Sequence, residues 1–177
     1  GHQAGYNNPT GIRRESVGHE EGVDISSNDN TVVGYNAAKY TSSGQYNVAI
    51  GSSALYLNTT ASENTAIGFQ AMQSNTTGPE NTAVGFKAMY DNQDGYENVA
   101  VGGSALADLL SGHSNTAIGY RSLFLNTAST NTAVGHQAGY TNTTGIRMAA
   151  FGDLAADANT TGNDTVAFGR NALTTNT

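Results

Sequence analysis

The residues of this sequence best suited to chemistry are three glutamates that recur at one fixed spacing. Glu63, Glu80 and Glu97 lie 17 residues apart. Two carboxylates at a suitable separation are enough to hydrolyse a glycosidic bond. A row that is copied at a constant interval, however, offers no singular and asymmetric site of the kind that catalysis needs. We therefore predict no catalytic residues and no enzyme activity.

Metal binding is the second chemistry that carboxylates could support here. Stacked carboxylates repel one another unless solvent, a basic group or a cation offsets their charge, and calcium needs about six or more oxygen ligands. The segment DNQDG, from Asp91 to Gly95, resembles the start of a calcium-binding loop but lacks its spacing and its final Glu. Histidines are scattered along the chain, at His2, His19, His113 and His136. We therefore predict no metal and no cofactor.

Aromatic side chains recur in two rows at the same interval. One row consists of Tyr35, Phe69, Phe86 and Tyr120. The other row consists of Tyr6, Tyr56, Tyr90, Phe124 and Tyr140. Rings that stack along the molecule or between chains would be structural, whereas a row of exposed rings could bind sugars. Both interpretations stay open, and the second row is the candidate ligand-binding site.

The common interval comes from a repeat that runs through the whole chain. Its anchor is the Gly that closes the motif NTAVG, and successive anchors are 17 residues apart, with two steps of 16. A sustained period of this kind is the signature of a solenoid, in which each repeat forms one coil. The anchors are Gly1, Gly18, Gly34, Gly51, Gly68, Gly85, Gly102, Gly119, Gly135, Gly152 and Gly169.

The pattern within one repeat predicts two short strands and sharp corners. The residues before the anchor are small or β-branched, as in the TAI of residues 65–67, which is typical of a strand. Ala follows three residues after most anchors, and Leu or Met often comes next, which predicts a second strand. Asn and Gly farther along tolerate positive φ and predict a corner.

Asparagine keeps one register from coil to coil. Stacked side-chain amides can form hydrogen bonds along such a ladder, so we predict a structural role for these residues and for the anchor glycines. The predicted ladder consists of Asn30, Asn47, Asn64, Asn81, Asn98, Asn115 and Asn131, together with Gly51, Gly68, Gly85, Gly102 and Gly119.

These patterns predict an all-β fold, a parallel β-solenoid or β-roll of about ten coils of 17 residues. Residues 1–177 form a single repeat array, and the module restarts near residue 135, where the GHQAGY of residues 1–6 returns. Because the chain begins in the middle of a repeat, we expect a fragment of a longer fibre. One face of each coil carries Val and Ile, and the other carries Ala and Gly. Small residues would let another chain approach closely, which favours an oligomer.

Composition argues against several kinds of partner. The 177 residues include 7 Lys and Arg against 14 Asp and Glu, a net charge of −7, with no basic cluster. We therefore expect no nucleic-acid partner and no anionic membrane surface. No apolar run reaches the roughly 20 residues of a membrane span, so we expect no direct membrane insertion. Cysteine is absent, which leaves the compartment open.

The motif NTAVG or NVAIG, with Ala three residues later, resembles the head repeats of trimeric autotransporter adhesins of the YadA type. It is also similar to the NTAVG-type repeats of phage tail fibres. The resemblance covers nearly the whole chain and weakens over residues 13–28 and 147–163. It implies a left-handed parallel β-roll, a homotrimer and an extracellular, surface-exposed location on a virion tail fibre or a bacterial surface. The adhesin repeats are shorter, which leaves the shape of each coil open.

The resulting hypothesis is a structural and adhesive fibre segment, the stalk or head of a tail fibre or adhesin. It would contribute to host or surface attachment through a cell-surface glycan or protein receptor. The alternative is a polysaccharide-degrading enzyme on a β-solenoid scaffold. A distant alternative is an ice-binding solenoid, based on the shared register of Thr59 and Thr76, although Gln93 and Leu110 interrupt that row.

Four of the five sequons of the type N-x-T lie in the NTT segment of a predicted corner. The corner itself explains them without glycosylation, because Asn and Thr are common turn residues. They begin at Asn58, Asn75, Asn142, Asn159 and Asn163.

Overall fold

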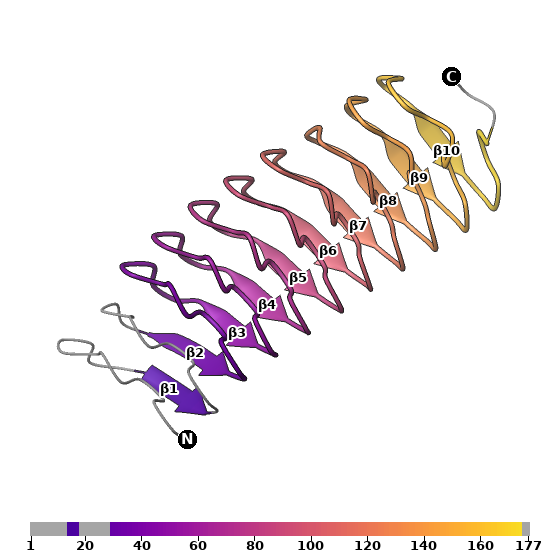
Figure 1. Ribbon diagram of the computed structural model, residues 1–177. Helices are drawn as coiled ribbons and strands as arrows, with labels where there is room; N and C mark the ends of the chain where they lie inside the picture. Colours follow the sequence, from indigo (N-terminus) through magenta and orange to yellow (C-terminus); the bar gives the residue numbers. More distant parts are fainter. Residues whose placement is uncertain (1–13, 18–28, 175–177) are drawn as a thin grey trace.

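The computed structural model describes residues 14–17 and 29–174, which form a rod of stacked coils (Figure 1). Each coil contributes one strand, and each strand pairs in parallel with the strand of the next coil. These residues contain no helix and form a parallel β-solenoid of about eight turns. The predicted solenoid is confirmed. The predicted count of about ten coils is slightly too high for the described part, because most of the first two coils lies outside it.

The strands follow the chain in order and make one sheet. They are β1 (Arg14–Val17), β2 (Asn30–Val33), β3 (Val48–Ile50), β4 (Thr65–Ile67), β5 (Thr82–Val84), β6 (Val99–Val101), β7 (Thr116–Ile118), β8 (Thr132–Val134), β9 (Ala149–Phe151) and β10 (Val166–Phe168).

The strand register follows the repeat of the sequence. Ala66 pairs with Ala49 on one side and with Ala83 on the other, so equivalent residues of successive repeats lie side by side. The middle residue of each strand from β3 to β10 is a buried Ala. Because side chains alternate between the two sides of a strand, the residues that flank each Ala point outward.

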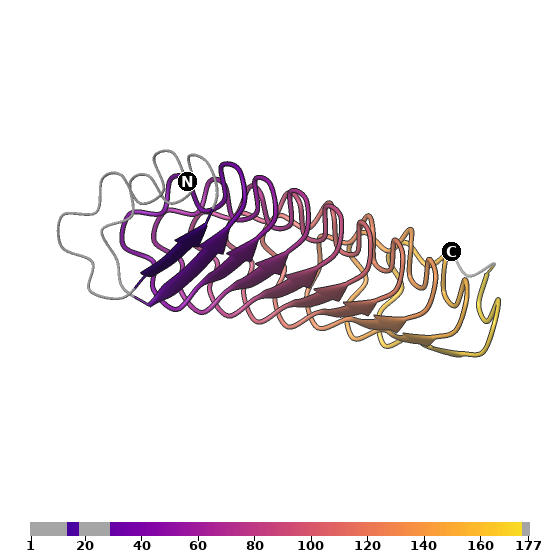
Figure 2. The same cartoon turned by 90° about the horizontal axis from the view of Figure 1, so that it is seen from below.

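We call the outward side of this sheet the sheet face. Figure 2 shows its strands along one side of the rod, with the loops on the other side. The first column of the sheet face is Thr31, Val48, Thr65, Thr82, Val99, Thr116, Thr132, Ala149 and Val166. The second column is Val33, Ile50, Ile67, Val84, Val101, Ile118, Val134, Phe151 and Phe168.

The predicted second strand is wrong. The segment after each anchor is a series of turns in which the second and fourth residues have positive φ, as at Gln70 (φ 56°) and Met72 (φ 50°). A left-handed residue costs about 1–2 kcal/mol and interrupts an extended backbone. The sequence carries the signal, because neither position holds a β-branched residue in any coil from Gly34 onward, and such residues tolerate positive φ least.

Backbone hydrogen bonds between coils hold these left-handed residues. The N–H of Gln70 donates to the carbonyl of Ser52 in the preceding coil at 2.9 Å. The N–H of Met72 donates to the carbonyl of Ala88 in the following coil, also at 2.9 Å. Both bonds recur along the array, so the turn segments are paired from coil to coil as regularly as the strands.

A narrow core fills each coil. The coil that begins at Gly85 shows its composition: Ala88, Met89 and, from its strand, Ala100 are all fully buried. The expectation that the Ala and Gly face would contact another chain is therefore wrong. This face points into the core of its own coil, and the β-branched residues of the strands face outward instead.

Anchor glycines allow successive coils to stack closely. Gly85 has a φ of 139°, and a Cβ placed there would lie 2.6 Å from the carbonyl oxygen of Gly102 in the next coil. A side chain at this position would push the coils apart, so both backbone conformation and lack of space select glycine.

We predict that Gly85→Ala destabilises the fold much more than Gly169→Ala does. Gly169 has a similar φ of 117°, but a Cβ there would meet no described atom within 4 Å. The cost of the conformation, about 1–2 kcal/mol, is thus common to both variants. Gly85→Ala should lose about 2 kcal/mol or more of unfolding free energy in addition, because its Cβ disturbs the close contact between coils. Urea unfolding followed by circular dichroism gives both values, and equal losses would contradict the prediction.

Two ladders of asparagine run through the interior. In the predicted ladder, Asn98 Oδ1 accepts a hydrogen bond from the N–H of Asn115 at 2.9 Å, and Asn98 Nδ2 donates to the carbonyl of Gly112 at 2.9 Å. The corner asparagines form a second ladder, in which Asn92 Nδ2 donates to Asn75 Oδ1 at 2.8 Å. Side chains of both ladders are buried, so they satisfy backbone groups that water does not reach.

Asn98→Ala should lower the free energy of unfolding by about 2–4 kcal/mol, because it leaves the N–H of Asn115 and the carbonyl of Gly112 without these partners. The matched control is Asp94→Ala, at an exposed corner position, where a change within about 0.5 kcal/mol is expected. Thermal and urea unfolding measure both. A similar loss of unfolding free energy in the two variants would show that the ladder does not stabilise the fold.

Candidate functional site

The structure separates the two aromatic rows by exposure. The candidate ligand-binding row is half-buried rather than exposed at its described members, Tyr56, Tyr90, Phe124 and Tyr140. Its first member, Tyr6, lies outside the described residues. The row that follows the anchor is between 47% and 56% exposed, at Tyr35, Phe69, Phe86 and Tyr120. We call these the inner ring row and the outer ring row.

Rings within a row stack where neighbouring coils both carry one. Phe69 and Phe86 of the outer row are 5.7 Å apart between centroids and inclined by 10°. Phe124 and Tyr140 of the inner row are 5.4 Å apart and inclined by 12°. Stacking of this kind contributes about 0.5–1.5 kcal/mol beyond burial. The rings therefore have a structural contribution and also form part of the surface.

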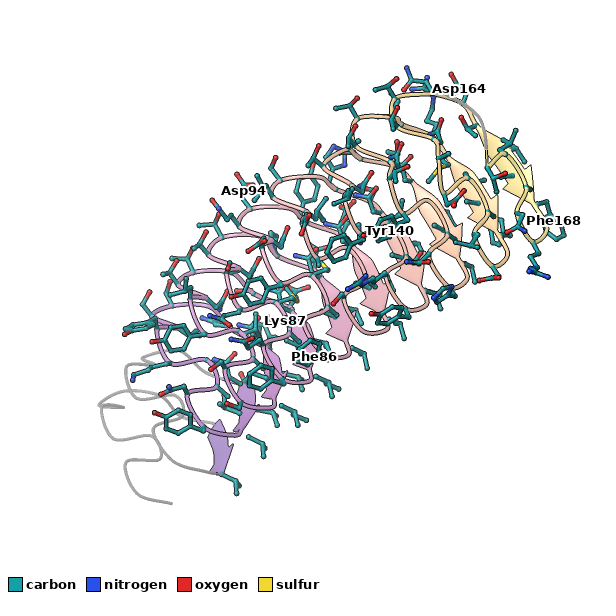
Figure 3. All side chains as sticks on the ribbon, turned by 45° about the vertical axis from the view of Figure 1, so that its right-hand side comes forward. Phe86, Lys87, Asp94, Tyr140, Asp164 and Phe168 are labelled. Atoms are coloured by element: carbon teal, nitrogen blue, oxygen red, sulfur yellow. The ribbon has the colours of Figure 1, made fainter. Side chains whose placement is uncertain are left out.

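A basic side chain lies between the two ring rows in the coil that begins at Gly85. Lys87 Nζ is 5.6 Å from the ring centroid of Phe86 and 5.0 Å from that of Tyr90. Figure 3 shows Phe86 and Lys87 close together on one side of the rod, with Tyr140 farther along it. The recurring interval in the sequence identifies the rings but not the cation, although Lys87 directly follows Phe86.

Arg121 repeats this arrangement two coils later. Its Cζ is 5.2 Å from the ring centroid of Tyr120 and 5.4 Å from that of Phe124. Each such cation–π contact contributes about 0.5–1 kcal/mol at an exposed site. Arg121 Nε is buried and has no hydrogen-bond partner among the described residues. The guanidinium group is therefore held by rings rather than by carboxylates.

Two aspartates lie beside the ring rows in adjacent coils. Asp91 and Asp108 occupy equivalent positions, six residues after Gly85 and Gly102. Partial burial raises the pKa of Asp91 above its ordinary value, although the charge of Lys87 partly opposes this. Burial raises the pKa of Asp108, and the negative charge of Asp91 raises it further. Sequence reasoning considered Asp91 only as part of DNQDG and missed the pair.

The glutamates that suggested chemistry lie on the surface. Glu63, Glu80 and Glu97 are exposed and have positive φ, and Glu97 accepts a hydrogen bond from the hydroxyl of Ser114 at 3.0 Å. Their register is a structural position of the coil, and the array offers no enclosed pair of them.

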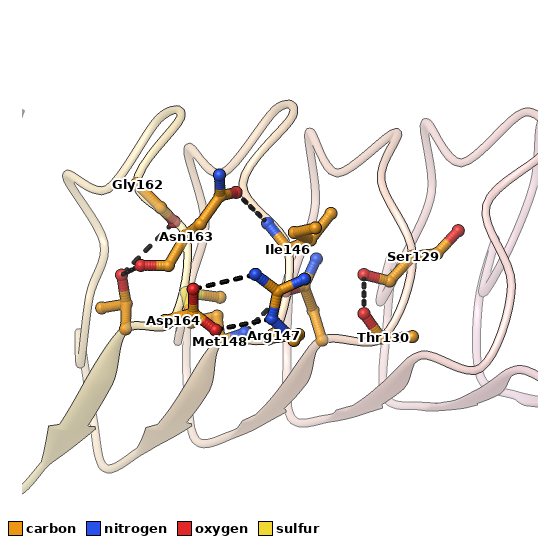
Figure 4. Close-up of polar contacts among 10 residues, drawn as sticks. Ser129, Thr130, Ile146, Arg147, Met148, Gly162, Asn163 and Asp164 are labelled. Carbon is orange, nitrogen blue, oxygen red and sulfur yellow. Dashed lines mark hydrogen bonds and ion pairs between the residues drawn. The ribbon is translucent and has the colours of Figure 1, made fainter.

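Later coils place an exposed ion pair in the same register. Arg147 donates two hydrogen bonds to the carboxylate of Asp164, at 2.5 and 2.8 Å (Figure 4). The hydrogen bond from Arg147 lowers the pKa of Asp164 below its ordinary value. Exposed pairs of this kind contribute little to stability, so this pair is a surface feature of the rod and does not define a site.

The histidines and the DNQDG segment form no metal centre in the described part of the chain. Residues 14–17 and 29–174 contain no group of three or more His, Cys, Asp or Glu side chains that could hold a metal ion. His113 stacks on Tyr96, and His136 contacts Asp153 at 2.9 Å. His2 and His19 lie outside the described residues. Asp94 lies at a corner of its coil, away from Phe86 and Lys87 (Figure 3).

Corner residues are used by the fold itself. The hydroxyls of Thr59 and Thr76 donate to backbone carbonyls of the next coil at 3.0 Å, so they do not form a free hydroxyl array for ice. Four sequon asparagines are fully buried and hydrogen-bonded, at Asn58, Asn75, Asn142 and Asn159. Asn163 is exposed, and its Oδ1 accepts a hydrogen bond from the N–H of Ile146 (Figure 4).

Comparison with known proteins gives no family assignment. No protein-family model, no curated protein and no solved structure matches the chain. In the described residues, no helix has the length and apolar character that crossing a membrane requires. The function of the chain is therefore inferred from its surface geometry and from the resemblance of the repeat motif.

Asp108→Asn should stabilise the fold at neutral pH. Burial and Asp91 raise the pKa of Asp108 in the folded state above its ordinary value of 3.8, so the charged form is disfavoured by folding. The stability that this group provides is fully present below pH 3.8 and is lost as the pH rises through the raised pKa. The gain from Asn should therefore vanish as the pH falls to that value.

Thermal unfolding of both proteins across this pH range tests the prediction. Asp94→Asn is the matched control, because Asp94 lies at an exposed corner. A gain for Asp108→Asn that persisted below pH 3.8, or an equal gain for the control, would contradict the proposed cause.

Proposed function

We propose that this chain is a segment of an extracellular fibre, built as a homotrimer and contributing to attachment to a host or another surface. The segment is the stalk or head of a phage tail fibre or of a bacterial surface adhesin. This proposal rests on the resemblance of the NTAVG repeats together with the apolar sheet face. The sheet face is the single observation that carries it.

The sheet face is an apolar strip along the rod. Its second column consists only of Val, Ile and Phe, and its first column only of Thr, Val and Ala. Ile67, Ile118 and Phe151 are 37%, 40% and 37% exposed. With coils about 4.8 Å apart and a strip about 10 Å wide, the area is roughly 400 Å². The largest apolar patch on a typical monomer has a similar area and is often functional.

A second copy of the same chain is the partner that fits this strip. The strip has one period and no charged side chain in either column from β2 to β10, so an identical strip matches it along its whole length. It supplies about half of the roughly 800 Å² that each partner buries in a standard interface. An assembly that gives each chain two neighbours brings more of its surface into contact, and the resemblance to trimeric adhesins selects three chains.

The rest of the coil suits a spacer that also carries binding residues. Buried asparagine ladders and close coil contacts make each repeat dependent on its neighbours, which favours a straight and stiff rod. The ring rows lie on the segment after the anchor, not on the sheet face. Assembly through the sheet face would leave them available to a cell-surface glycan or a protein receptor.

The solution mass of the chain tests the assembly. Light scattering should give about three times the chain mass of 18.2 kDa, and Ile67→Glu should reduce it to the monomer mass, because a buried unpaired charge costs several kcal/mol. Thr77→Glu, at an exposed corner, is the control and should leave the mass unchanged. A wild-type monomer at all concentrations would overturn the proposal.

A polysaccharide-degrading enzyme is the second candidate, and the aspartate pair is the observation that favours it. Among the described coils only two carry Asp at this position, Asp91 and Asp108, and both have raised pKa values, as a general acid requires. Release of new reducing ends from capsular polysaccharide, lost in Asp108→Asn, would support this candidate. The fibre proposal expects no such release.

A further inference from the structure

One coil in the middle of the array carries no ring in either row. At the outer and inner ring positions of the coil that begins at Gly102 stand Gly103 and Ala107. Both neighbouring coils carry a ring at both positions. These four rings are Phe86 and Tyr90 on one side and Tyr120 and Phe124 on the other.

The missing rings leave two rings without an aromatic neighbour on one side along the rod. Phe86 stacks on Phe69 in the preceding coil, and Tyr120 stacks on His136 in the following coil at 5.8 Å. Between Phe86 and Tyr120 lie two coil steps, about 10 Å, with only Gly103 in their row. Tyr120 leans over this glycine, since a Cβ there would lie 3.4 Å from its Cδ2. No aromatic side chain of the described residues covers the faces that Phe86 and Tyr120 turn toward this coil.

Hydrogen-bonding groups border these ring faces. Lys87, Ser104 and Arg121 occupy the same position in three successive coils, and Asp91 and Asp108 lie beyond the inner ring row in two of them. Neither the side chain of Lys87 nor that of Arg121 forms a hydrogen bond or ion pair within the described residues. Both can therefore turn toward a ligand without losing one.

A purely structural role does not explain this coil. Single rings are also missing at Ser52 and Gln73, and both rings are missing at Asp153 and Asp157, but among the described coils only this one lacks both rings between two coils that each carry both. Each stacked pair adds stability. Gly103 and Ala107 forgo two such contacts in each row. The net charge near the site also differs from that of the chain. Lys87 and Arg121 balance Asp91 and Asp108, whereas the whole chain carries a net charge of −7.

We infer that Phe86, Lys87, Tyr90, Gly103, Tyr120 and Arg121 form a binding site for a neutral pyranose unit of a glycan chain. The apolar C–H face of a pyranose stacks on aromatic rings, and its hydroxyls both donate and accept hydrogen bonds. The balanced charges select no net charge on the ligand. This inference rests on the proposed attachment function and names the ligand class of its binding surface.

Calorimetric titration with cellohexaose, maltohexaose and α-1,6-mannohexaose tests the site. The wild-type chain should bind at least one of these neutral probes with a Kd of about 1 mM or below. Tyr120→Ala removes one platform and should weaken binding at least tenfold. Gly103→Phe places a ring in the empty position of the outer row, without a forbidden φ, and should also weaken binding at least tenfold while the melting temperature is kept or raised.

The control variant is Tyr56→Ala, which removes a ring of the inner row three coils away and should leave the Kd unchanged. If none of the probes binds, or if Tyr120→Ala and Gly103→Phe bind as well as the wild type, the site is overturned. If Gly103→Phe does not fold, the comparison of the Kd of Tyr120→Ala with that of Tyr56→Ala is sufficient to test the site.

The outcome is distinguishable from failure of the fibre proposal. All residues of the site come from one chain, so the monomeric variant Ile67→Glu should bind the same probe with the same Kd. A monomeric wild type that binds would overturn the trimer and support the site. A wild-type trimer that binds no probe would support the trimer and overturn the site.

Discussion

Backbone hydrogen bonds from coil to coil are the interaction on which this structure depends. They join extended residues in the strands and left-handed residues in the turns, as for Gln70 with Ser52 and Met72 with Ala88. Each coil buries only a few small or medium-sized side chains, so a single coil has too little core to be stable alone. The bonds form only when equivalent residues lie side by side, which explains why the sequence holds its period so closely.

Interior exceptions show how strict this requirement is. Gly139 stands where most other coils have Leu or Met, and Met148 stands where most have Asn. A Cβ on Gly139 would lie 2.4 Å from Met148 Cε, so the methionine fills the space that the glycine leaves. Leu109 replaces an asparagine of the corner ladder without such compensation. As a result, Asn92 Oδ1 has no hydrogen-bond partner in the described structure. An unpaired buried carbonyl of this kind costs about 1–3 kcal/mol.

The period, the strand before each anchor and the asparagine register could be predicted from the sequence, because each repeats with little variation. The second strand could not be predicted from the Ala and Leu pattern, since two adjacent buried residues, such as Ala88 and Met89, fit both a strand covered on its two faces and a turn with left-handed residues. Its signal was negative: β-branched residues are absent at positions such as Gln70 and Met72. The cation positions of Lys87 and Arg121 were missed because they depend on which side of the turn each residue faces.

Periodic and singular features of the surface call for different partners. A column of Val and Ile that repeats in every coil reaches its full contact area only against a surface with the same spacing. Another copy of the chain has that spacing because it has the same sequence. Gly103 and Ala107 occur together in one described coil, so a periodic partner would find a defect there. A ligand about as large as one coil step would instead contact rings of the two neighbouring coils. Because the coil-to-coil hydrogen bonds leave outward side chains free to vary, one scaffold can carry both kinds of surface on different faces.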